Sequence, residues 1–123
     1  GPRATALTTD AISLAGCTGA QDAGRVFTLG AQRVMLQEGR AVTAEGTLAG
    51  SLLTMDAALQ RVVEYGAASL RDAARMASET PARLLGLADR GRIVPGTLAD
   101  LVILEEDLTL HQVLLGGRPV ARP

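Results

Sequence analysis

The chain has 123 residues, of which 47% are hydrophobic and 2% aromatic, which is enough for one domain with an aliphatic core. Its 12 basic and 13 acidic residues leave a net charge of −1 without any basic stripe, which argues against nucleic acid as a partner. No run approaches the roughly 20 continuous apolar residues of a membrane span, so we expect no membrane partner.

The first part of the chain predicts a buried strand followed by a small antiparallel sheet. Residues 4–9 form a short apolar, β-branched run that ends at Asp10, and a loop rich in Gly, Ala and Ser follows over 11–24. Apolar runs separated by glycine-bearing turns predict a hairpin within 26–43. Glycines and small residues in the block 45–51 predict a loop whose backbone can approach another surface closely.

The middle of the chain predicts three helices in series. The first covers 54–66 and stops at its terminal glycine. The second covers 69–79, where Ser69 opens a capping box. The third covers 80–86, because a threonine followed by Pro81 is typical of a helix start.

The last part of the chain returns to strands. Pro95-Gly96 predicts a turn, and an apolar strand follows over 99–104. Beyond a charged bend at 105–107, two strand-like runs flank Gly116-Gly117, a pair that suits a two-residue hairpin turn. We therefore expect a second, C-terminal hairpin over 108–121.

Asp10 is the candidate catalytic residue. A carboxylate at the C-terminal tip of a buried parallel strand stands where α/β barrels place their chemistry. Such a group can accept a proton and later return it. The alternative is structural, because aspartate often caps the turn that follows a strand. The residues alone leave both roles open.

Neither His111 nor Cys17 predicts a reactive centre. Metal binding needs three or four converging ligands, and these two residues are far apart in the sequence, so the chain is expected to hold no metal site by itself. His111 falls in a predicted strand and is interpreted as a structural or surface residue. Cys17 lies in the Gly-rich loop and is interpreted as a bystander thiol. A lone cysteine cannot form an internal disulfide, which favours a cytoplasmic location.

Four motifs together carry a resemblance to a known family. In chain order they are Thr8-Thr9-Asp10-Ala11, the run from Glu45 to Met55, Met76-Ala77-Ser78 with Pro81-Ala82, and the run from Gly91 to Val102. Their order and spacing resemble the C-terminal third of N-acetylglucosamine-6-phosphate deacetylase, a member of the amidohydrolase superfamily. The Pro-Gly-x-x-Ala-Asp-Leu-Val motif at 95–102 is shared across the superfamily, whereas Gly-Thr-Leu-Ala-Gly-Ser at 46–51 is narrower and favours the deacetylase.

The resemblance implies an α/β fold that is part of a larger one. The chain would be the C-terminal fragment of a metal-dependent hydrolase (β/α)8 barrel, together with the C-terminal strands of a small β-sandwich domain. Residues 1–90 would complete the barrel, with 4–9 as its last strand and 26–43 as a β excursion. Residues 91–123 would belong to the sandwich.

The resemblance also implies a reaction. The family hydrolyses the N-acetyl group of N-acetylglucosamine 6-phosphate, giving glucosamine 6-phosphate and acetate, with a water activated by a divalent metal such as zinc. Asp10 matches the family's acid/base, and Leu48, Ala49, Gly50 and Ser51 match its substrate-contacting loop. The family's metal ligands lie upstream of this chain, so the chain alone is expected to bind no metal and to hydrolyse nothing.

Two partners and two alternatives follow. The expected partners are the missing N-terminal portion of the same protein and a further copy of the chain, because a partial barrel exposes strand edges. One alternative is a fragment of another amidohydrolase, dihydroorotase-like or adenine-deaminase-like, which would share the motif at 95–102 and the strand-ending aspartate. The other is a non-catalytic module that binds a sugar or a protein without turnover.

Overall fold

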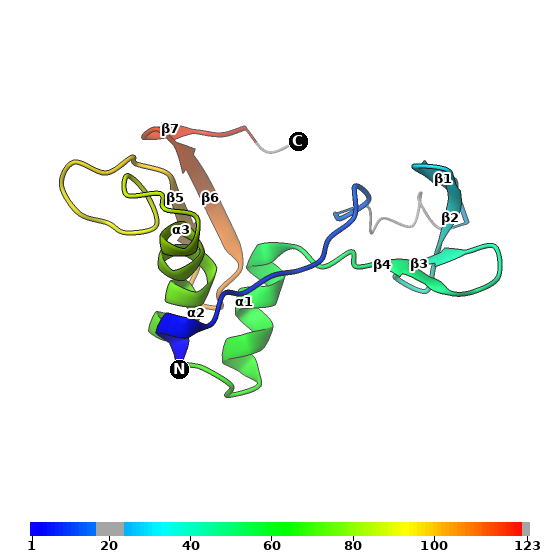
Figure 1. Ribbon diagram of the computed structural model, residues 1–123, viewed down its shortest axis with the longest axis horizontal. Helices are drawn as coiled ribbons and strands as arrows, with labels where there is room; N and C mark the ends of the chain where they lie inside the picture. The colour runs from blue at the N-terminus through cyan, green and yellow to red at the C-terminus, as the bar shows by residue number, and fades with distance from the viewer. Residues whose placement is uncertain (17–23, 122–123) are drawn as a thin grey trace. The chain divides into compact units, whose positions relative to one another are not determined.

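The computed structural model describes residues 1–16 and 24–121, and the chain forms two compact units. Unit 1 combines Gly1–Thr8 with Met55–Pro123, and unit 2 comprises Thr9–Thr54. Figure 1 shows the helices and strands of both units. The fold contains helices and antiparallel sheets, so the predicted mixed α/β class is confirmed.

Unit 2 is built on a four-stranded antiparallel sheet in which each strand pairs with the next along the chain. The turn between the second and third strands uses Glu38 and Gly39, both with positive φ (50° and 72°), as two-residue hairpins require. The predicted hairpin within 26–43 is confirmed, and the sheet goes further than predicted by one strand. The strands are β1 (Val26–Leu29), β2 (Gln32–Gln37), β3 (Arg40–Thr43) and β4 (Leu48–Gly50).

The core of unit 2 lies on one face of this sheet. Val34 and Leu36 are buried and alternate with more exposed positions along β2, because successive side chains of a strand point to opposite faces. Ala41 from β3 and Leu14 from the N-terminal side complete the buried cluster. Partly buried side chains surround it: Ile12, Phe27, Leu29, Ala49 and Leu52.

Unit 1 begins its helical part with α1 (Met55–Glu64). The helix ends in a glycine cap, where the Gly66 N–H donates to the Val63 carbonyl at 2.9 Å and the Ala67 N–H donates to the Val62 carbonyl at 3.1 Å. Gly66 has φ 68°, the left-handed conformation that this cap needs. The predicted first helix and its stop are therefore confirmed.

The second and third predicted helices form one continuous helical run rather than two separate helices. It comprises α2 (Leu70–Ala74), a π-helical turn η3 (Arg75–Glu79) and α3 (Thr80–Leu84). The predicted start of the third helix at Thr80 agrees with α3, but the helix is not separate, because a π turn leads directly into it. The π turn accommodates Pro81, which has no N–H and whose ring crowds the preceding turn. Ser69 caps the run as predicted, and its Oγ accepts from the Asp72 N–H at 3.2 Å.

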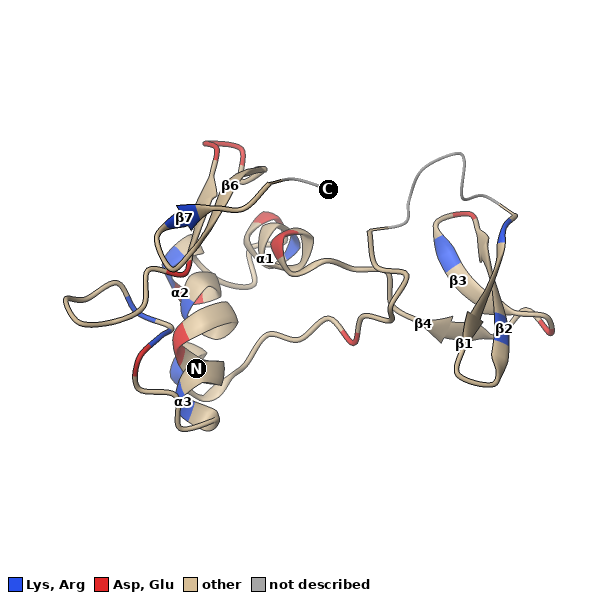
Figure 2. Ribbon diagram, turned by 90° about the horizontal axis from the view of Figure 1, so that it is seen from above, with Lys and Arg blue, Asp and Glu red and all other residues tan. Residues whose placement is uncertain are grey.

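Charged residues of both signs occur along these helices, as the blue and red segments of the ribbon show (Figure 2). Arg75, the first residue of the π turn, lies 3.5 Å from an Asp72 oxygen and 3.6 Å from a Glu79 oxygen. Pairs at this helical spacing stabilise a helix by about 0.2–0.5 kcal/mol each. The pair of Arg75 with Glu79 thus spans the π turn, and the pair with Asp72 connects the turn to α2.

The predicted strand over 4–9 is not formed. Pro2–Ala4 make a 3-10 turn, η1, and the segment that follows is extended but pairs with none of the described strands. A buried parallel strand needs a neighbouring strand for its backbone hydrogen bonds, and the described residues supply none here. The segment instead runs beside the helix, where the Leu7 N–H donates to the Met76 carbonyl at 2.8 Å.

The C-terminal hairpin forms as predicted. A three-stranded antiparallel sheet contains β5 (Leu101–Leu104), β6 (Leu110–Leu115) and β7 (Arg118–Pro119). Gly116 and Gly117 make the turn with φ of 55° and 78°. Among the described residues, no helix is long and apolar enough to cross a membrane.

Candidate functional site

The candidate site starts from Asp10, which is exposed and has φ 50°. A positive φ is uncommon for any residue with a side chain, although aspartate tolerates it better than most. The next residue, Ala11, pairs with Ser51 in a parallel bridge. The Ile12 N–H then donates to the Ser51 carbonyl at 3.0 Å. Two predicted site segments, distant in sequence, therefore meet directly after Asp10.

The predicted substrate loop Leu48–Ser51 is partly a strand. Its first three residues form β4, which pairs with β3 through an irregular register, and Leu48 remains 65% exposed. Ser51 is already engaged, because its Oγ accepts from the Leu53 N–H at 3.0 Å. The loop therefore presents an exposed apolar side chain at one end and an ordered turn at the other.

Position 50 has no room for a side chain, because the side chain of another residue occupies the space beside Gly50. A Cβ at this position would lie 2.3 Å from Cγ2 of Ile12, and the φ of 149° is itself unfavourable for other residues. Ile12 thus fills the place that a larger residue would need, next to the bridge between Ala11 and Ser51. The sequence analysis did not identify Ile12, and the only signal was an apolar residue just after the candidate acid.

The superfamily motif at 95–102 has a structural role in unit 1. The Asp100 Oδ1 accepts from the Gly116 N–H at 2.8 Å, and its other oxygen lies 3.9 Å from the Arg90 guanidinium. Arg90 also hydrogen-bonds Asp89, which lowers the pKa of that carboxyl. Asp100 therefore connects the motif to the turn of the C-terminal hairpin rather than to a reacting group.

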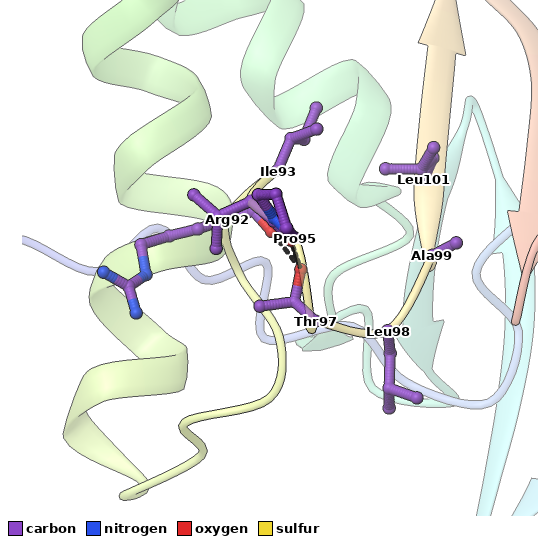
Figure 3. Close-up of a pocket in the computed structure, with 8 residues that line it drawn as sticks. Arg92, Ile93, Pro95, Thr97, Leu98, Ala99 and Leu101 are labelled. Carbon is purple, nitrogen blue, oxygen red and sulfur yellow. Dashed lines mark hydrogen bonds between the residues drawn. The ribbon is translucent and has the colours of Figure 1, made fainter.

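The same motif lines a shallow apolar cavity of about 210 Å³ (Figure 3). Its walls come entirely from residues 92–101, and the Arg92 guanidinium points away from Leu98, Ala99 and Leu101. The Thr97 hydroxyl is used within the loop, where it hydrogen-bonds the carbonyls of Arg92 and Val94. A cavity without a directed polar group gives little basis for specific ligand binding.

The two other reactive residue types do not add to the site. His111 Nδ1 lies 2.5 Å from a Glu105 oxygen, and both side chains are more than half exposed, which agrees with the predicted surface role. Cys17 lies outside the described residues. Within residues 1–16 and 24–121, no group of three His, Cys, Asp or Glu side chains could hold a metal ion. These residues alone therefore do not fit a metal centre.

Comparison with known proteins gives a family and consistent relatives. The model of the amidohydrolase family matches residues 17–114. The chain is 38% identical over 92 residues to N-acetylglucosamine-6-phosphate deacetylase of Lysinibacillus sphaericus, a match covering 75% of this chain and 24% of that protein. It is also 38% identical over 113 residues to N-acetylgalactosamine-6-phosphate deacetylase of Escherichia coli O157:H7, covering 91% of this chain and 29% of that protein.

The chain is also similar to a solved structure. An aspartate-to-alanine variant of N-acetyl-D-glucosamine-6-phosphate deacetylase from Mycobacterium smegmatis, in complex with N-acetyl-D-glucosamine 6-phosphate, superposes with a TM-score of 0.81 at 32% identity. The match covers 97% of this chain and 31% of that one. The resemblance to these deacetylases predicted from the motifs is confirmed, and the chain spans less than a third of each of these three relatives.

Proposed function

We propose that this chain, which belongs to the amidohydrolase family, is the segment of an N-acetylglucosamine-6-phosphate deacetylase that carries its acid/base, Asp10. The observation that carries the proposal is the pairing of Ala11 with Ser51, which joins the acid-bearing segment to the predicted sugar loop. The two residues, 40 positions apart in the sequence, meet at one place in a chain whose relatives include deacetylases.

The architecture proposed for the whole enzyme follows the same comparison. Residues 1–90 would complete a (β/α)8 barrel, and residues 91–123 would supply strands to a β-sandwich domain. In this arrangement the extended segment 4–9 becomes a strand only when the preceding part of the polypeptide provides its neighbours.

Asp10 would serve first as base and then as acid. In its ionised form it accepts a proton from the attacking water as the new C–O bond forms at the N-acetyl carbonyl. The tetrahedral intermediate then loses the amine, and Asp10 returns the proton to the nitrogen as the C–N bond breaks. The products are acetate and glucosamine 6-phosphate. A carboxylate suits both steps because it is ionised before the attack and protonated after it.

The loop Leu48–Ser51 would contact the sugar. Small residues at Ala49 and Gly50 bring main-chain groups near the surface, where they can hydrogen-bond sugar hydroxyls. The exposed Leu48 side chain offers an apolar contact beside them. Binding energy from this loop would hold the N-acetyl group within reach of the acid/base.

The proposed enzyme needs partners that this chain does not contain. The family implies a divalent metal such as zinc, which supplies an activated water when bound. Because the described residues hold no ligand cluster, we place the ligands in the preceding part of the same polypeptide. We also propose that the enzyme is a homo-oligomer, which would cover sheet edges that are otherwise open to pairing.

Acetate release tests the proposal. The purified chain, given N-acetylglucosamine 6-phosphate with zinc, is expected to release none, whereas the longer polypeptide that contains it should release acetate and glucosamine 6-phosphate. In that polypeptide Asp10→Asn should lower kcat by about 10²- to 10⁴-fold, the usual contribution of a general acid/base.

Glu38→Gln is the matched control for this substitution, because Glu38 is another exposed carboxylate with φ 50°. It should leave kcat unchanged. Activity retained by Asp10→Asn, or an equal loss in both variants, would contradict the role of Asp10.

A second sugar is a candidate substrate because N-acetylgalactosamine-6-phosphate deacetylase is among the relatives. Its match is 38% identical over 113 residues, the same identity as the match to the first deacetylase. The two sugars differ in the configuration of one hydroxyl, so kcat/KM should be measured for both. Turnover of dihydroorotate or release of ammonia from adenine would favour the other amidohydrolase alternatives, and sugar binding without turnover by the longer polypeptide would favour a binding module.

A further inference from the structure

Ile12 contacts the predicted sugar loop through both its backbone and its side chain. Its N–H donates to the Ser51 carbonyl at 3.0 Å, directly after the bridge between Ala11 and Ser51. Its Cγ2 methyl group occupies the space where a Cβ of residue 50 would lie, and its Cβ and Cγ1 lie 3.6 and 3.8 Å from the same point. Because Ile12 is only two positions after Asp10, these contacts join the loop to the acid-bearing segment.

The same side chain packs on the core of unit 2. It lies against the buried cluster of the sheet, and so do Ala49 and Leu52, on either side of the bridged residue of the loop. A β-branched side chain has a restricted χ1, so the place of Cγ2 follows closely from the backbone at Ile12. All of these residues, like Asp10, belong to unit 2, so the contact does not depend on the other unit.

We propose that Ile12 is a positioning residue: its Cγ2 methyl group, packed against Gly50, sets the spacing between the acid-bearing segment and the predicted sugar loop. The inference rests on the proposed acid/base role of Asp10. Glycine at position 50 allows the close approach, and the branched side chain of Ile12 determines how close it is. An acid/base that must reach a sugar held by this loop depends on the spacing, because a misplacement of about 1 Å can cost about 10²-fold in rate.

Ile12→Leu and Ile12→Val separate the branched methyl group from the volume of the side chain. Leucine has the same number of carbon atoms but a single substituent on Cβ, so it lacks the Cγ2 methyl group. Valine is smaller, yet it keeps all three atoms that lie near position 50. In the longer enzyme Ile12→Leu should lower kcat per folded molecule about 10-fold, whereas Ile12→Val should leave it close to the wild-type value. A residue that only filled the core would tolerate leucine at least as well as valine.

Leu14→Ala is the matched control, because Leu14 belongs to the same buried cluster, whereas the three atoms nearest to a Cβ at position 50 all come from Ile12. This variant should lose stability but keep kcat per folded molecule, with the folded fraction measured by circular dichroism at the assay temperature. In the 123-residue chain, the nuclear Overhauser effect between the Gly50 α-protons and a branched methyl group at position 12 should persist in Ile12→Val and Leu14→Ala and be lost in Ile12→Leu. The proposal is overturned if Ile12→Leu keeps wild-type kcat, or if Leu14→Ala lowers kcat per folded molecule as much.

Asp10→Asn separates this proposal from the proposed function. If Asp10→Asn has no effect on turnover, the proposed function fails whatever the Ile12 variants do. If Asp10→Asn abolishes turnover while Ile12→Leu and Ile12→Val both match the wild type, only the positioning role fails. KM for the sugar should stay unchanged in Ile12→Leu, because the loop keeps its own contacts with the sugar. A rise in KM without a fall in kcat would instead assign Ile12 to binding and overturn the role in spacing.

Discussion

Alanine at position 50 should destabilise unit 2, because the site of the new methyl group is already filled. The added Cβ would lie 2.3 Å from Cγ2 of Ile12, whereas carbon atoms in favourable contact are about 3.5–4.0 Å apart. Relieving such an overlap by side-chain or backbone shifts costs about 1–3 kcal/mol. The φ of 149° adds strain of about 1–3 kcal/mol for a residue with a side chain.

Two further variants separate the cost of the steric overlap from the cost of the backbone strain. Gly46→Ala also creates an alanine at positive φ (79°), but nothing lies within 4 Å of its Cβ, so it should carry the strain alone. Ile12→Ala removes the opposing methyl group. The double variant Ile12→Ala/Gly50→Ala should therefore be more stable than the sum of the two single changes by about 1–3 kcal/mol, the overlap term.

Urea titration followed by amide signals of unit 2 measures these differences. The buried Val34 and Leu36 report on the core of that unit without contribution from the helices of unit 1. The expected order of stability is wild type, then Gly46→Ala, then Gly50→Ala. Additive behaviour of the double variant would refute the reasoning, since it would mean that the methyl group of Ile12 does not oppose the new Cβ.

Three other changes test contacts that hold the remaining elements in place. Ser69→Ala removes a helix cap and should lower the stability of unit 1 by about 1 kcal/mol in urea unfolding. Asp100→Ala leaves the Gly116 N–H without its acceptor and should speed exchange of that amide. The pKa of Asp107 lies below its ordinary value of 3.8 because the Thr109 side chain and N–H hydrogen-bond the ionised form. The stability from these bonds is present above pH 3.8 and lost as pH falls through the folded pKa, and Thr109→Ala should raise the NMR midpoint of Asp107 towards 3.8.

Elements governed by local chemistry were predictable from the sequence. Both glycine stops of the helices were identified, and at Gly86, as at Gly66, the two hydrogen bonds of the cap are formed. The turn at Gly116-Gly117 needs two residues with positive φ, and the sequence supplies two glycines. In each of these cases a single short stretch of chain determines the backbone, so no distant contact was needed to predict it.

Elements that depend on distant residues were not predictable. The run 4–9 has the composition of a strand, but strand formation requires a neighbour to pair with, and the described residues provide none. Pro81 reads as a helix start because proline suits the first turn, yet a π turn lets the helix continue through it. The residue type of Asp10 was identified, whereas its positive φ and the fit of Ile12 against Gly50 depend on packing that no local pattern encodes.

The way in which Asp10 is held suits its proposed role as an acid/base. Its own conformation is unfavourable, with φ 50°, so neighbouring contacts have to maintain it. One such contact lies within the same unit, where the Ile12 N–H donates to the Ser51 carbonyl. This bond does not involve the carboxylate, so it persists when the carboxylate gains or loses a proton. In the proposed acid/base role, Asp10 could therefore take up a proton in one step and return it in the next while this backbone contact stays formed.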